Sequence, residues 1–169
     1  SDDGGVPVAQ RGICWATTQY PDVNSSHTDV GMGTGSYTVT IPNLQVATTY
    51  YVRAYAVNQT GTVYSAQRTF TTTNGLPTVT TAVVSNITAN SAQCGGNISN
   101  NGGFSVTARG VCWNTTGNPD LNGDHTTNGN GNGTFTANMT NLTPGTTYHV
   151  RAYATNSTGT VYGEDRTFT

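Results

Sequence analysis

The side chains that could do chemistry in this sequence are few, and the clearest group of them lies in one polar stretch. Asp120, Asn122 and Asp124 follow the alternating oxygen spacing of calcium-binding loops. The twelfth position of such a loop normally supplies a bidentate Glu, and here it is Gly131. We therefore expect a solvated turn without a cofactor, with a Ca²⁺ site as the alternative.

The three histidines offer no pattern of catalysis or zinc binding. His27, His125 and His149 have no Cys or carboxylate at a spacing typical of zinc sites. A Gly-x-Ser-x-Gly elbow and a paired-carboxylate signal are also absent from the sequence. The sequence therefore favours a protein that is not an enzyme.

A long internal repeat positions these residues. Residues 1–71 align with residues 99–169 without a gap, at an offset of 98, and 39 of the 71 positions are identical. The most regular part runs from Thr48 to Asn58 and returns as Thr146 to Asn156. A fixed period of this kind indicates tandem copies of one structural unit.

The composition excludes several classes of partner. Charged residues make up 8% of the chain, the formal net charge is −2, and all six basic residues are Arg. They fall in three register pairs: Arg11 and Arg109, Arg53 and Arg151, Arg68 and Arg166. Scattered arginines do not form the basic patch of a nucleic-acid-binding protein. No run approaches the ~18 apolar residues of a membrane helix, so we expect no membrane insertion.

Short segments rich in β-forming residues alternate with turn residues along the whole chain. The expected strands are residues 11–16, 36–41, 49–58, 62–71, 77–84 and 92–98, with a long loop over residues 17–36. In the strand 49–58, alternation places Tyr50, Val52, Ala54 and Ala56 inward. No segment shows apolar residues at helical spacing, and many short strands predict an all-β sandwich.

The two copies differ in what precedes them. The second unit has two strands within residues 77–98, ahead of the turn 99–103, whereas the first unit begins at the equivalent turn, residues 1–5. We therefore expect an incomplete unit at 1–71, a linker at 72–76 and a complete unit at 77–169. The missing strands would come from more of the same chain, from a neighbouring subunit that donates a strand, or from a different protein.

At this point the sequence resembles fibronectin type III-like modules. The matching residues are Leu142, Pro144, Thr147, Tyr148, Val150, Ala154, Asn156 and Gly159. The run Arg109-Gly110-Val111-Cys112-Trp113 after Gly102-Gly103 looks like the variant found in tandem in bacterial secreted and surface proteins. The first copy has Val46 where the family has Pro. The resemblance implies a seven-stranded, two-sheet sandwich without catalytic activity, used as a spacer, adhesin or stalk.

Tyrosines and cysteines are the expected structural residues of the modules. Tyr50 and Tyr148 follow Leu44 and Leu142 by six residues, which suits a tyrosine corner. The odd number of cysteines stands out, and the strands predict that Cys94 and Cys112 both point inward.

We expect those two cysteines to form a disulfide, which would stabilise the unit by roughly 3 kcal/mol. The alternative is a pair of inert buried thiols. By the same register, the natural partner of Cys14 would lie outside the chain.

Several aromatic residues are candidates for surface contacts. Trp15, Trp113, Tyr55 and Tyr153 are expected to project from one sheet, where they could bind a sugar or a neighbouring protein. The alternative is that these rings stack across neighbouring strands.

These features favour a non-enzymatic structural or adhesive repeat module, located outside the cell or on its surface. The expected assembly is a fibre, stalk or filament, and the expected partners are copies of the chain or adjacent repeats, because a surface with few charges loses little on being desolvated. The alternative is a spacer or carbohydrate-binding accessory module of a secreted enzyme, with a glycan as its partner.

Overall fold

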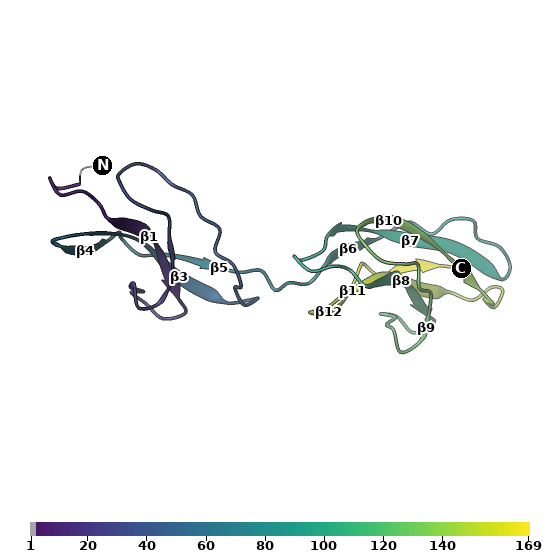
Figure 1. Cartoon of the computed structure of the whole chain (residues 1–169). Coiled ribbons are helices and arrows are strands. Elements are labelled where there is room, and N and C mark those ends of the chain that lie inside the picture. Colours follow the sequence, from purple (N-terminus) through teal and green to yellow (C-terminus); the bar gives the residue numbers. More distant parts are fainter. Residues whose placement is uncertain (1–2) are drawn as a thin grey trace. The chain divides into compact units, whose positions relative to one another are not determined.

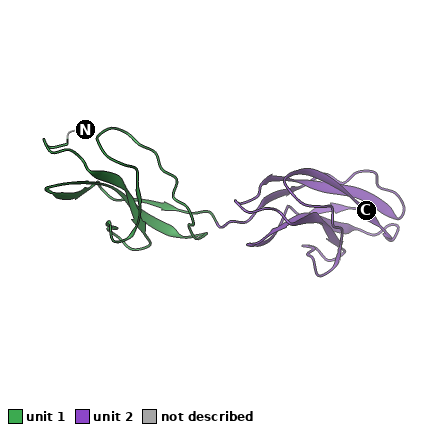
Figure 2. Cartoon of the chain, in the orientation of Figure 1, with its two compact units in different colours: residues 1–73 green, residues 74–169 purple. Residues whose placement is uncertain are grey.

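A computed structural model describes residues 3–169, which form only β-strands, turns and irregular segments (Figure 1). The chain divides into two compact units, residues 1–73 and residues 74–169, which we call unit 1 and unit 2 (Figure 2). Every strand pair is antiparallel. Among the described residues, no helix is long and apolar enough to cross a membrane.

Unit 2 is a sandwich of two sheets. Its strands are β6 (Thr78–Thr81), β7 (Ser91–Asn100), β8 (Ala108–Asn114), β9 (Asp124–His125), β10 (Gly133–Thr140), β11 (Tyr148–Asn156), β12 (Gly159–Tyr162) and β13 (Arg166–Phe168). One sheet has the order β10-β7-β6, and the other has the order β12-β11-β8-β9, with β13 also paired to β11. This arrangement confirms the predicted fibronectin type III-like architecture.

The core of unit 2 lies between its two sheets and consists of two clusters. The first comprises Ala92, Cys94, Val111, Trp113, Ala137, Met139, Leu142, Val150 and Phe168. The second comprises Val79, Ile98, Val106, Ala152 and Ala154, with Phe135 and Val161 packed against it. Val150, Ala152 and Ala154 are fully buried, so alternation places the predicted residues of β11 inward.

Unit 1 is a single five-stranded sheet. Its strands are β1 (Gln10–Ala16), β2 (Ser26–Asp29), β3 (Thr49–Asn58), β4 (Gly61–Tyr64) and β5 (Arg68–Thr71), in the order β2-β1-β3-β4 with β5 also paired to β3. The strand expected at residues 36–41 is absent. The counterpart of this segment in unit 2 is β10, which pairs only with β7. The described residues of unit 1 contain no strand equivalent to β7, and the segment therefore has no strand with which to pair.

Three further boundaries differ from the expectation. The return strand expected at 62–71 is interrupted between β4 and β5, where Ser65 Oγ accepts a hydrogen bond from Ala54 N. The loop expected at 17–36 contains β2. The last residues of the expected linker belong to unit 2, because Gly75 is buried and its carbonyl accepts a 2.7 Å hydrogen bond from Asn156 Nδ2.

Candidate functional site

Cys94 and Cys112 do not face each other. Val111 and Trp113 are both part of the core, so alternation places Cys112, which lies between them in β8, on the outer face of its sheet. There its sulfur lies 3.3 Å from the carbonyl of Pro119. Cys94 belongs to the core between the sheets. The disulfide prediction was wrong because it assumed inward positions for both residues, and the two thiols are free and buried.

The burial of these thiols changes their acidity. Desolvation raises the pKa of Cys112 to about 11, and it also raises the pKa of Cys94 and of Cys14 above the ordinary value. Cys14 is fully buried, with its sulfur 3.3 Å from the carbonyl of Pro21. It thus repeats the outer-face position of Cys112, and the expectation that its disulfide partner lies outside the chain stays a prediction. Neutral thiols of this kind are poor nucleophiles.

Tyr50 and Tyr148, near the starts of β3 and β11, each form a hydrogen bond with nearby backbone. The hydroxyl of Tyr148 accepts a 3.0 Å hydrogen bond from the backbone N–H of Thr143, and Tyr50 accepts the same bond from Gln45. Each ring also stacks on a phenylalanine, with centroid distances of 5.7 and 5.8 Å. Leu142 is buried in the core of unit 2, whereas Leu44 is half-buried. These contacts are those of a tyrosine corner.

The aromatic residues expected on the surface do not form an exposed patch. Trp113 lies in the core, and Trp15 is half-buried at the equivalent place. Tyr55 and Tyr153 are each only 2% exposed. Tyr153 does lie on the outer face, but the chain that follows β9 covers it, and its hydroxyl donates a 2.8 Å hydrogen bond to the carbonyl of Thr126.

A glycine allows this covering segment to approach the sheet. A Cβ at Gly110 would lie 2.0 Å from the carbonyl oxygen of Thr126. Gly12 has the same role in unit 1, where the carbonyl of Thr28 would be 1.8 Å away. The prediction of exposed tyrosines failed because alternation gives the face of a side chain and not what covers that face.

The acidic loop of unit 2 is held by its own hydrogen bonds. The two carboxylate oxygens of Asp120 accept hydrogen bonds from the backbone N–H and from Nδ2 of Asn122, at 2.9 and 3.0 Å. Asp124 is exposed in β9. Within residues 3–169, no group of three or more His, Cys, Asp or Glu side chains could hold a metal ion.

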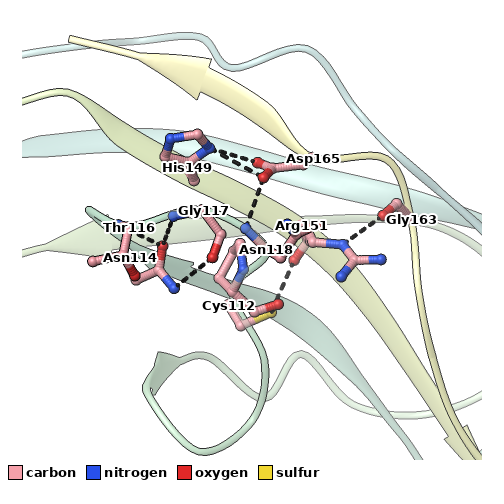
Figure 3. A network of polar contacts seen from close by, with 10 residues as sticks. Cys112, Asn114, Thr116, Gly117, Asn118, His149, Arg151, Gly163 and Asp165 are labelled. Atoms are coloured by element: carbon pink, nitrogen blue, oxygen red, sulfur yellow. Dashed lines mark hydrogen bonds and ion pairs between the residues drawn. The ribbon is translucent and has the colours of Figure 1, made fainter.

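A polar network of unit 2 was not anticipated from the sequence (Figure 3). His149 Nδ1 lies 3.1 Å from both carboxylate oxygens of Asp165, and Asp165 Oδ2 accepts a 2.8 Å hydrogen bond from the backbone N–H of Asn118. The network ties the loop after β8 to the segment before β13. In unit 1 the same loop is tied by Gln67, whose Oε1 accepts a hydrogen bond from Tyr20 N. The presence of a counterpart without His or Asp indicates a structural role.

The most distinctive surface of the chain is the inner face of the sheet in unit 1. Its residues are Val8, Ile13, Trp15, Val52, Ala54, Ala56, Val63 and Phe70, and we call this set the open face. Every member except Val63 is half-buried, and Val63 is 68% exposed. Their counterparts Val150, Ala152 and Ala154 in unit 2 are 0% exposed. The two faces have nearly the same side chains, but only that of unit 2 is covered by a second sheet.

Two adjoining hollows lie over the open face. The larger, of about 410 Å³, is lined by Val8, Ala56 and Val63 among others. The smaller, of about 290 Å³, is lined by Tyr37, Ala54 and Val63 among others. In unit 2 the counterparts of these residues pack against Val79 and Ile98, which belong to the covering sheet.

In unit 2 the covering sheet is also fixed by polar contacts at one buried residue, Thr81 of β6. Its Oγ1 accepts a 3.1 Å hydrogen bond from Ala152 N, its N–H donates to Glu164 Oε2 at 2.9 Å, and its carbonyl accepts from Arg166 Nε at 2.9 Å. The N–H of Thr81 lowers the pKa of Glu164. Unit 1 has Ala66 in place of Glu164, so the open face lacks this carboxylate.

Comparison with known proteins finds similar solved structures but no relative by sequence. No family model matches the chain, and no curated protein matches it. Among solved structures, the chain is similar to the FN1–FN3 domains of chicken CNTN1, with 16% identity and a TM-score of 0.43 over 94% of this chain. It is also similar to a two-domain fibronectin type III segment of chicken tenascin, with 16% identity and a TM-score of 0.43. The chain spans 52% of the CNTN1 fragment and 82% of the tenascin fragment.

Proposed function

We propose that the chain is a non-enzymatic structural repeat module that associates, through the open face, with copies of itself or with adjacent repeats of the same kind. The observation that carries the proposal is the uncovered state of apolar residues whose counterparts in unit 2 are buried, with Val161 alone half-buried. Uncovered apolar faces of this type mark sites of protein association.

The proposed assembly is a fibre or stalk outside the cell. A contact between the open face and a different surface of the next copy is heterologous, and such contacts propagate as filaments when they do not close into a ring. The charged fraction of 8% supports this assembly, because few charges need to be desolvated at the contacts. The extracellular location is supported by the composition alone. The cysteines are free, so no disulfide supports an oxidising compartment.

The alternative of a carbohydrate-binding module has lost the observation that suggested it. Three of the four aromatic residues expected to contact a sugar are buried, and Trp15 forms part of the open face. No other exposed aromatic cluster among the described residues replaces them.

Two matched substitutions test the proposal. Val63 on the open face is 68% exposed, and Val83 in unit 2 is 73% exposed, so Asp at either position leaves folding unaffected. In light scattering, we expect the average mass of the wild-type chain and of Val83→Asp to rise with concentration. The average mass of Val63→Asp should stay at that of the monomer. A wild-type chain that remains monomeric at every concentration, with β3 fully protected from hydrogen exchange, would refute the proposal.

A further inference from the structure

The geometry points to a specific occupant of the open face: one extended β-strand with the pattern of β7, carried by a further repeat of the same kind and inserted antiparallel to residues 35–41. This inference rests on the proposed function and names the partner of the same surface.

The side chains that the open face lacks identify the occupant. Most members of the two core clusters of unit 2 have an apolar counterpart in unit 1, at an offset of 98. The members that have no counterpart are Val79 from β6, and Ala92, Cys94 and Ile98 from β7. Three of the four absent side chains thus come from one strand, in the order Ala-x-Cys-x-x-x-Ile.

The shape of the open face adds a requirement for glycine in that strand. In unit 2 a Cβ at Gly96 would lie 2.6 Å from the Cβ of Ala152, closer than real Cβ contacts. The counterpart of Ala152 is Ala54, which lines the smaller hollow. A strand laid on the open face in the same way therefore needs a residue without a side chain above Ala54.

The segment at residues 36–41 supplies the edge that the strand would join. Its counterpart β10 pairs with β7 along residues 133–140, opposite residues 98–91. Transferred by the offset, residues 35–42 would pair with the incoming strand, except that Pro42 has no N–H to donate. Residues 36–41 have the alternation of a strand but form none, because the strand with which they would pair is missing.

A single strand fits the open face better than the pair formed by β6 and β7. In unit 2 the strand β6 is held through Thr81 by Glu164 and Ala152. In unit 1 the residue equivalent to Glu164 is Ala66, and the N–H of Ala54 is already bonded to Ser65 Oγ. Of the three hydrogen bonds that fix β6 through Thr81, the two to Ala152 and Glu164 therefore have no equivalent in unit 1. The apolar residues of the open face that would contact a strand like β7 are still present.

The test uses a fluorescent synthetic peptide with the sequence of residues 91–100, added under reducing conditions to the dilute 169-residue chain. Binding is followed by fluorescence anisotropy, and hydrogen exchange of residues 35–41 is followed by mass spectrometry. We expect saturable binding together with protection of residues 35–41. The same peptide with Gly96→Val should bind at least about tenfold more weakly, because the added side chain overpacks the contact with Ala54.

Protein variants give the matched control. Ala54→Val should weaken binding of the peptide, because it enlarges the side chain that the glycine of the strand would contact, and Val83→Asp should leave binding unchanged. Equal binding of the Gly96→Val peptide, or binding without protection of residues 35–41, overturns the inference. Binding that instead exposes β7 of unit 2 to exchange shows that the peptide has displaced β7 within unit 2 and has not occupied the open face, and it also overturns the inference.

The two proposals fail separately. Absence of peptide binding, in a chain whose self-association depends on Val63, removes the inference and leaves the proposed function standing. Peptide binding to a chain that does not self-associate removes the association between copies from the proposed function and leaves the association with a further repeat.

Discussion

Modification of the cysteines in the native protein tests the placement of Cys112 on the outer face of its sheet. The pKa of its thiol is raised from 9.0 to about 11 by desolvation. At pH 8 a thiol of pKa 9 is about 10% thiolate, and one of pKa 11 is about 0.1% thiolate, so the reactive fraction falls by about 100-fold. Complete burial of the sulfur slows the reaction further.

The assay is the reaction with Ellman's reagent at pH 8, with and without denaturant. We expect no fast phase in the native chain and three titrated thiols after unfolding. The intact mass should be the same with and without reductant. A native chain that is lighter by two hydrogens, with Cys94 linked to Cys112 in the peptide map, would refute the assignment of the two residues to different faces.

Three further predictions concern stability. Val150→Ala should destabilise unit 2 by about 2 kcal/mol, measured by hydrogen exchange of β11, because it removes two fully buried methyl groups, whereas Val52→Ala in the open face should cost less than half as much. Since the folded pKa of Cys112 lies above its unfolded value, the folded state holds its proton more tightly, and the stabilisation present below pH 9 should fall by about 1.4 kcal/mol per unit between pH 9 and 11. Cys112→Ala should reduce that slope in denaturant titrations while the contributions of Cys14 and Cys94 remain, and an unchanged slope would contradict the assignment. Tyr148→Phe should cost about 1 kcal/mol in the same titrations, through loss of the hydrogen bond from Thr143, and an unaffected midpoint would rule out a stabilising corner.

Local pattern was sufficient to predict most strands of the chain. The strand β3 has the predicted bounds, Thr49–Asn58, because its β-forming residues alternate without interruption. The inward positions predicted for the strand 49–58 also hold for the counterparts Val150, Ala152 and Ala154 in β11. The segment at 36–41 has an equally good pattern and forms no strand, because a strand needs a partner as well as a sequence. Pattern alone therefore overestimates strands wherever the partner is missing.

The candidate site was harder to predict, because faces and covers depend on tertiary structure. The face of Cys112 could have been predicted from its neighbours. Val111 and Trp113 are two large apolar residues that flank it, and choosing them for the core would have placed Cys112 on the opposite face. The burial of Tyr153 could not, because it depends on the path of the loop that follows β9. The open face was anticipated as a deficit of strands, but its hollows and the glycine requirement above Ala54 appear only when the two units are compared in three dimensions.

The contacts of Thr81 have a consequence for the behaviour of unit 2 under mechanical load. They connect the first strand of the unit, β6, to the start of its last strand, β13, since Thr81 is bonded to Arg166 and also to Glu164 just before that strand. Tension applied along the strands to the two ends of the unit would act on these bonds in shear, so they would have to break together rather than in succession. Unit 1, where Ala66 replaces the carboxylate, has no such latch within its described residues. Under the same tension, unit 1 would therefore extend at lower force than unit 2.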